Sequence, residues 1–173
     1  MNARVRLLAA VALGVAAAVV VTSSLNAPPT SPGEEVTSSL DVPFEYFDGT
    51  QGNLADFGGR PLVVNFWASW CPACVAEMPD FERVHTRLGE DVAFLGLAMQ
   101  ESDESAAREL IEETGVTYEL GRDPDGSIFA DFGGIAMPTT VFIDRDGAVV
   151  STHPGAIFAD DLEATIRRQL LES

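Results

Sequence analysis

The junction at residues 61–74 constrains the fold of this chain more than any other feature of its sequence. PLVVNFWA, residues 61–68, is an unbroken apolar run, which is typical of a strand buried on both faces of a sheet. Cys71 and Cys74 follow shortly after it, and residues 72–88 carry apolar side chains at helical spacing. The junction therefore predicts a buried strand that passes directly into a helix, with the cysteine pair at the transition.

The rest of the domain repeats this alternation of strand and helix. VAFLGLAM (92–99) predicts a second buried strand, and ESAARELIEETG (104–115) predicts a helix capped by Gly115. Asp146-Gly147 is a turn signal between two strand-like runs at 139–144 and 148–153, which predicts a hairpin. Other predicted elements are strands at 42–47 and 116–120, one helical turn within 53–59, a short helix within 123–134 and a closing helix at 159–172. Strands alternating with helices, followed by a hairpin, predict an α/β domain with a mixed central sheet flanked by helices.

The first 39 residues read as an appendage to the fold. Arg4 and Arg6 precede an apolar run from Leu7 to Val21, which indicates a signal peptide or an uncleaved signal anchor over residues 1–25. Because no A-x-A pattern precedes a plausible cleavage point, we favour the anchor. Residues 26–39, rich in Ser and Pro, are expected to form a disordered tether to a folded domain at 40–173. Positively charged residues beside an apolar segment stay on the cytoplasmic side of the membrane, so the end of the segment with Arg4 and Arg6 is expected there. The domain is therefore expected to be exported, either tethered to the outer face of the cytoplasmic membrane or secreted.

The charge of the chain argues against one class of partner. Twenty-seven acidic residues and ten basic ones give a formal net charge of −17. Nucleic-acid binding takes its affinity mainly from Lys and Arg that neutralise phosphates, so we expect no nucleic-acid partner. The same charge repels an anionic membrane surface, so membrane contact is expected through the N-terminal segment only.

The cysteine content limits the chemistry that the chain can carry. Two cysteines can form one redox centre or half of a metal site. A zinc site would need further ligands, and only His85 and His153 are available, at spacings that fit none of the usual zinc patterns. Val75 follows Cys74 where covalent haem attachment needs a histidine. We therefore expect no metal and no cofactor beyond a redox-active disulfide between Cys71 and Cys74.

The position of the pair suits thiol–disulfide exchange. Cys71 is predicted at a helix N-terminus, where free backbone N–H groups and the helix dipole favour the reactive thiolate. Cys74 lies one helical turn further on the same side, so it could resolve a mixed disulfide formed by Cys71. Pro72 suits the first helical position. A purely structural disulfide here would close a very small loop and would remove little entropy from the unfolded chain.

The motifs around the pair resemble a known family. VVNFWASWCPACVAEMP, followed later by AMPTTVFIDRDG, is similar to the thioredoxin-fold family, and specifically to its exported TlpA/ResA-like (DsbE-type) branch of thiol–disulfide oxidoreductases. The resemblance covers residues 42–171. It implies a thioredoxin-like fold with an N-terminal extension and a central helix–strand insertion, which residues 104–120 would supply. The implied activity is disulfide exchange with exported proteins through the C-x-x-C pair.

The resemblance also implies roles for particular residues. Pro138 would be a cis proline packed against the cysteines, and the backbone of Met137 before it would pair with the substrate chain like an added strand. Glu77, three residues after Cys74, would accept the proton of that thiol; the alternative is an ordinary glutamate that favours the helix dipole and faces solvent. Trp70 would face the substrate or shield the site.

Two residues depart from the patterns of related proteins. Cytosolic thioredoxins place a buried aspartate where this chain has Asn65, whose amide cannot relay protons at neutral pH. This branch often has proline directly before the second cysteine, whereas here Pro72 directly follows the first, which weakens any transfer of a relative's redox potential to this chain.

The pair could work as a reductase of exported proteins, as in cytochrome c maturation, or as an oxidase in protein folding, with a membrane thiol–disulfide donor or acceptor as partner. A thiol peroxidase is disfavoured because Ala68 stands where such sites usually need a threonine.

Overall fold

The computed structural model of the chain describes residues 40–172. The predicted anchor at 1–25 and the predicted tether at 26–39 lie outside these residues. Among the described residues, no helix combines the length and the apolar character needed to cross a membrane.

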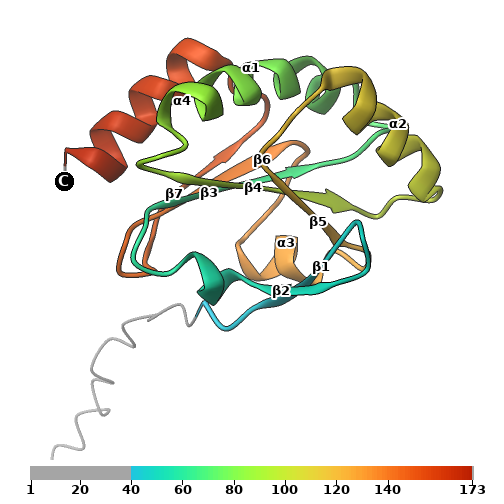
Figure 1. Cartoon of the computed structure of the whole chain (residues 1–173), viewed down its shortest axis with the longest axis horizontal. Coiled ribbons are helices and arrows are strands. Elements are labelled where there is room, and N and C mark those ends of the chain that lie inside the picture. Colours follow the sequence, from blue (N-terminus) through green and yellow to red (C-terminus); the bar gives the residue numbers. More distant parts are fainter. Residues whose placement is uncertain (1–39, 173) are drawn as a thin grey trace, which may run out of the picture. The chain divides into compact units, whose positions relative to one another are not determined.

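A seven-stranded mixed sheet forms the centre of the domain, as predicted (Figure 1). Its strand order is β2-β1-β5-β4-β3-β6-β7. The central pairs β3–β4 and β4–β5 are parallel, and all other pairs are antiparallel. The strands are β1 (Pro43–Tyr46), β2 (Gln51–Asn53), β3 (Leu62–Trp67), β4 (Ala93–Met99), β5 (Glu119–Asp123), β6 (Thr139–Ile143) and β7 (Val149–Pro154).

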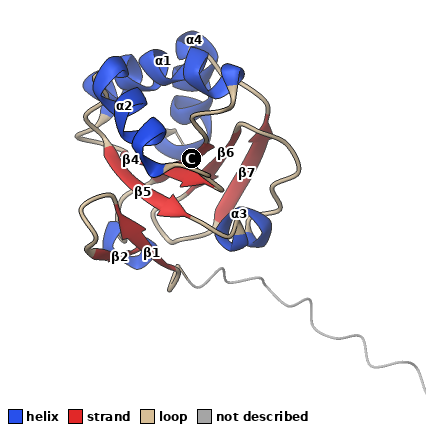
Figure 2. Ribbon diagram, turned by 90° about the vertical axis from the view of Figure 1, so that its right-hand side faces the viewer, coloured by secondary structure: helices blue, strands red, loops and turns tan. Residues whose placement is uncertain are grey.

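Helices cover both faces of this sheet (Figures 1 and 2). The helices α1 (Pro72–Leu88), α2 (Glu104–Thr114) and α4 (Ala159–Ile166) lie on one face, and the short α3 (Ser127–Asp131) lies on the other. A 3₁₀ turn, η1 (Leu54–Phe57), follows β2, and the chain after α4 continues as a π-helical turn, η2 (Arg167–Leu171). The boundaries predicted for α1 are confirmed, and α2 ends at Gly115 in the left-handed region, at φ 64°.

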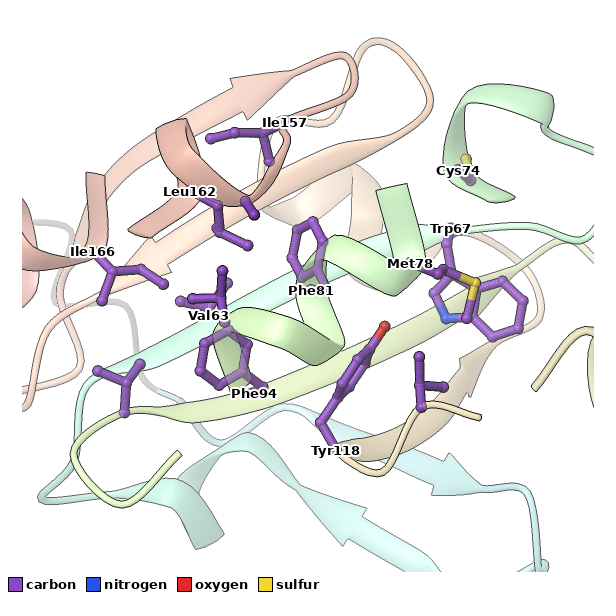
Figure 3. Packing of buried hydrophobic residues seen from close by; sticks show 14 of the residues in the cluster. Val63, Trp67, Cys74, Met78, Phe81, Phe94, Tyr118, Ile157, Leu162 and Ile166 are labelled. Carbon is purple, nitrogen blue, oxygen red and sulfur yellow. The ribbon is translucent and has the colours of Figure 1, made fainter. Parts of the chain in front are cut away.

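Alternation along β3 builds two hydrophobic cores, one on each face of the sheet. Val63 and Trp67 belong to the core beneath α1 and α4, where Phe81 and Leu162 pack (Figure 3). Leu62, Val64 and Phe66 belong to the core on the opposite face. Because side chains alternate along a strand, the polar residue between Val63 and Trp67 also faces α1. That residue is Asn65, and it is buried.

One strand prediction needs correction, and one strand was not predicted. The strand predicted at 116–120 is shifted, since β5 runs from Glu119 to Asp123. Val116 and Tyr118 are instead buried in the core beneath the helices before pairing with β4 starts. The extension of β5 is stabilised by Arg122, which forms ion pairs with Glu45 of β1 and with Glu104 of α2.

The strand that was not predicted lies near the start of the domain. The turn after β1 leads into a further strand, β2, which pairs antiparallel with β1 and which the sequence did not predict. Its short polar sequence, Gln51–Asn53, lacks the β-branched and aromatic residues that identify strands. Gly52 lies under the rings of Phe44 and Tyr46, where an added Cβ atom would approach ring carbons to 2.6 Å. Tertiary packing, not strand propensity, therefore explains β2.

Candidate active site

The cysteine pair lies where the sequence predicted it, between β3 and α1. Cys71 is the N-cap residue of α1, and Pro72 occupies the first turn. Cys71 and Cys74 form a disulfide, with their Cα atoms 5.3 Å apart. The backbone N–H of Cys74 donates a hydrogen bond to the Cys71 Sγ atom at 3.2 Å. Cys71 keeps 6% of its surface exposed whereas Cys74 keeps none, so Cys71 is the more accessible sulfur.

The segment before the cysteines is held by the loop that follows β4. The Glu101 carboxylate accepts hydrogen bonds from the Ser69 backbone N–H at 2.5 Å and from its hydroxyl at 2.6 Å. The indole Nε1 of Trp70 donates to the carbonyl of Gln100 at 3.3 Å. Trp70 nevertheless remains 54% exposed beside the cysteines. The loop therefore fixes an exposed aromatic side chain next to the redox pair.

Glu77 lies one helical turn after Cys74 and is completely buried. Its Oε1 atom accepts a hydrogen bond from the Asn65 amide at 2.8 Å, and its Oε2 atom accepts one from the backbone N–H of Ile157 at 2.9 Å. Burial raises the pKa of Glu77 to about 7, although both hydrogen bonds pull in the opposite direction. A buried side chain does not match the alternative of a solvent-facing glutamate. Glu77 can change its protonation state near neutral pH.

Asn65 forms a hydrogen bond with Glu77, and this contact was not predicted from the sequence. Strand alternation places the Asn65 side chain toward α1, where its Nδ2 atom donates to Glu77 and lies 3.5 Å from the Thr140 hydroxyl. The Asn65 Oδ1 atom is buried and has no hydrogen-bond partner. The signal that could have found the pair is the period of two along β3, combined with the apolar face of α1 that includes Glu77.

The peptide bond between Met137 and Pro138 is cis, as the resemblance implied. Pro138 is buried and directly precedes β6, whose Thr139 is in register with Phe66 of β3. This register places the Met137–Pro138 bond at the end of the sheet where β3 leads into the cysteines. Met137 is half-buried and packs against both cores, including the one that contains Cys71 and Cys74.

An exposed apolar residue near this bond was also missed. Ile135 is 85% exposed, and it lies two residues before Met137. The loop that carries Ile135 is anchored to Phe129, because Gly134 lies against the Phe129 ring and donates a backbone hydrogen bond to the Phe129 carbonyl at 2.9 Å. A single isoleucine after two glycines gives no sequence signal of its own, so only the structure identifies it.

The two histidines have structural positions. The His85 ring on α1 makes edge-on contacts with Phe94 and Tyr118, with centroid distances of 5.4 and 5.9 Å. His153 is exposed on β7.

Comparison with known proteins places the chain among redox enzymes. A family model described as Redoxin matches residues 29–166. The thiol-disulfide oxidoreductase ResA of Bacillus thuringiensis subsp. konkukian is 29% identical over 122 residues, which span 70% of each chain. The structure of MTB DsbF in its mixed oxidized and reduced forms matches with a TM-score of 0.69 and 29% identity, covering 75% of this chain and 96% of that one. A secreted Mycobacterium tuberculosis disulfide oxidoreductase homologous to E. coli DsbE matches with a TM-score of 0.68 and 26% identity, over the same shares.

The fold, the C-x-x-C disulfide at the start of α1 and these relatives agree with one another. An enzyme of this kind exchanges disulfides with the thiols and disulfides of other proteins. The chain belongs to the Redoxin family, as a thiol–disulfide oxidoreductase with the thioredoxin-like fold of the TlpA, ResA and DsbE type.

Proposed function

We propose that this enzyme reduces disulfides of exported proteins, with Cys71 as the attacking thiol and Cys74 as the resolving thiol. The observation that carries the exchange chemistry is the buried Glu77 one turn after Cys74, with a pKa raised to about 7, and the direction of electron flow is proposed from the residues between the cysteines. A group with a pKa near the working pH is well suited to accept and return a proton. Two observations support Cys71 as the attacking thiol. It is more exposed than Cys74, and its sulfur accepts a hydrogen bond from the backbone N–H of Cys74.

The proposed reaction transfers two electrons to the substrate. The Cys71 thiolate attacks one sulfur of the substrate disulfide, and the other sulfur leaves as a thiolate. Cys74 gives its proton to Glu77 and attacks the Cys71 sulfur, which breaks the mixed disulfide. The substrate leaves with both sulfurs reduced, and the enzyme keeps the Cys71–Cys74 disulfide. No metal or organic cofactor takes part, and a membrane thiol–disulfide donor restores the dithiol.

Substrate binding is assigned to residues that border the cysteines. The exposed Trp70 contacts the substrate. The Met137 backbone pairs with the substrate chain as an added strand, beside the buried Pro138. Extended pairing through the backbone accepts many sequences, which suits an enzyme that must reach different protein disulfides.

The proposed location of the enzyme rests on the residues near its N-terminus. Arg4 and Arg6 before the apolar run support export of the domain, with residues 1–25 as its anchor in the membrane. The relative from Mycobacterium tuberculosis described as secreted supports the same location. The substrates are therefore exported proteins, and apocytochromes before haem attachment are the class that the ResA resemblance favours.

The roles of the two cysteines can be tested by trapping. Cys74→Ser in the full-length chain should accumulate mixed disulfides in cells, because Cys71 can still attack but nothing resolves the product. Cys71→Ser should accumulate none, and the double substitution is the control for non-specific thiols. Mass spectrometry of the trapped complexes should identify exported proteins. Trapping by Cys71→Ser alone would reverse the assigned roles, and cytoplasmic partners would contradict export.

The direction of electron flow can be tested by the redox potential. Pro72 and Ala73 bring no charge and no donor side chain between the cysteines, so stabilisation of the thiolate rests mainly on backbone N–H groups. We therefore expect a moderately reducing couple, with a potential below about −180 mV. Equilibration of the full-length chain with mixtures of reduced and oxidised glutathione measures it. A clearly higher potential would replace the reductase proposal with oxidative protein folding.

A further inference from the structure

A surface groove of about 470 Å³ lies between the start of α1 and the helix α2. Its floor is apolar, and consists of Val75 from α1 together with Ala106 and Leu110 from α2. Trp70 also lines the groove, and this residue is more than half exposed to solvent. Two of its lining residues flank the redox pair in the chain, because Trp70 directly precedes Cys71 and Val75 directly follows Cys74.

Negative charge lines this groove. Asp103, Glu109 and Glu113 contribute carboxylates, and no described lining residue is basic. Glu109 and Glu113 are both exposed, and neither side chain forms an ion pair or a hydrogen bond within residues 40–172. The arginine nearest to them in sequence, Arg108, is occupied elsewhere, since it pairs with Glu104 and donates to the carbonyl of Phe47.

The arrangement of these charges has a cost for the helix. Glu109 and Glu113 are four residues apart, so they are neighbours on one face of α2. Two like charges at this spacing destabilise a helix, and the fold offers them no compensating cation. A positively charged partner in the groove would remove this repulsion and would also cover the exposed indole of Trp70.

We infer that this groove binds the part of a substrate protein next to its reacting cysteine, and that it selects segments in which apolar residues are combined with arginine or lysine. The inference rests on the proposed function and adds a substrate class to it. Apolar side chains of the segment lie over Val75 and Leu110, and its cations meet the carboxylates of Glu109 and Glu113. Contact with Trp70 then places the neighbouring substrate sulfur at Cys71.

The test compares two peptides that differ only in charge. Both carry one cysteine as a mixed disulfide with glutathione, flanked by leucines; one has two arginines and the other has two glutamines in their place. The full-length chain, reduced beforehand, supplies the electrons, and single-turnover rates are measured at low salt. We expect the arginine peptide to react about tenfold faster, because two exposed ion pairs contribute in the transition state. Raising the salt concentration should shrink this ratio.

Matched variants separate the groove from the charge of the whole protein. Glu109→Gln combined with Glu113→Gln should bring the ratio of the two rates close to one. The control combines Glu90→Gln with Glu112→Gln; it removes the same charge from exposed positions outside the groove and should keep the ratio. Ala106→Phe, which fills the floor, should slow both peptides relative to oxidised glutathione as the substrate.

Three results would count against these ideas in different ways. Equal rates for the two peptides would overturn the inference. An equal loss of the ratio in the control variant would also overturn it, because the preference would then come from the net charge of −17 and not from the groove. Failure to reduce either peptide or oxidised glutathione would instead overturn the proposed reductase function.

Discussion

Glu77→Gln is expected to slow resolution of the mixed disulfide by about 100-fold, while the first attack by Cys71 changes little. Glutamine cannot accept the proton of Cys74, so the resolving thiolate has to form without its base. The first step needs only the Cys71 thiolate. In the disulfide form the Cys71 sulfur accepts the backbone N–H of Cys74, whereas the hydrogen bonds of Glu77 go to Asn65 and Ile157. Rapid mixing of the reduced enzyme with a peptide disulfide, followed by acid quenching and mass spectrometry, separates the two steps.

The pH dependence of the same step identifies the group responsible. In the wild-type enzyme, the rate of resolution should rise with pH through about 7, since Glu77 accepts a proton only when it is ionised. Glu77→Gln should lose this inflection. Glu90→Gln, at an exposed position, is the control for the loss of one charge and should keep it. If both steps run at wild-type rates in Glu77→Gln, the assignment of Glu77 as the proton acceptor is wrong.

The local structure around Glu77 makes glutamine a fair substitute. The Ile157 N–H can still donate to the side-chain oxygen of a glutamine. The amide group of that glutamine would then face the amide of Asn65, donor against donor. Rotation of the Asn65 amide by half a turn would present its Oδ1 atom, which has no partner in the wild-type structure. A slow variant would therefore report the loss of a proton acceptor and not a damaged fold.

The parts of this fold that were predicted correctly rest on local signals. The apolar runs of β3 and β4 are longer than those of strands with one face at the surface, and α1 begins at a proline and is capped by a glycine. The C-x-x-C spacing fixed both cysteines on one turn at the helix N-terminus. These features depend on neighbouring residues and on periodicity, which a sequence displays directly.

The parts that were missed depend on contacts between distant segments. β5 continues to Asp123 because Arg122 finds carboxylates on β1 and α2, more than seventy and about eighteen residues away. The burial of Glu77 depends on Asn65 and on the loop at Ile157, eighty residues later. The groove beside Trp70 exists only because α2 packs next to α1. No local pattern encodes any of these neighbours, so the sequence supported a role for Glu77 but not its environment.

Ionisation of Glu77 is also expected to govern how stability depends on pH. The pKa of Glu77 is raised from 4.5 to about 7 on folding, so between these values the folded chain binds this proton more tightly than the unfolded chain does. The stabilisation is therefore fully present below pH 4.5 and is lost as the pH rises through about 7. Between pH 5 and pH 8 the free energy of unfolding should fall by about 2 to 3 kcal/mol from this group alone.

Urea unfolding of the oxidised full-length chain at these two pH values measures the fall, and Glu77→Gln isolates the part due to Glu77. Burial also raises the pKa of Asp123, which acts in the same direction and is unchanged in the variant, so the difference between the two proteins is the quantity to compare. The variant should lose most of the pH dependence and should be the more stable protein at pH 8, because it no longer holds a buried negative charge. Equal pH dependence in both proteins would show that Glu77 stays ionised across this range, which would also remove the physical basis for its role as a base near pH 7.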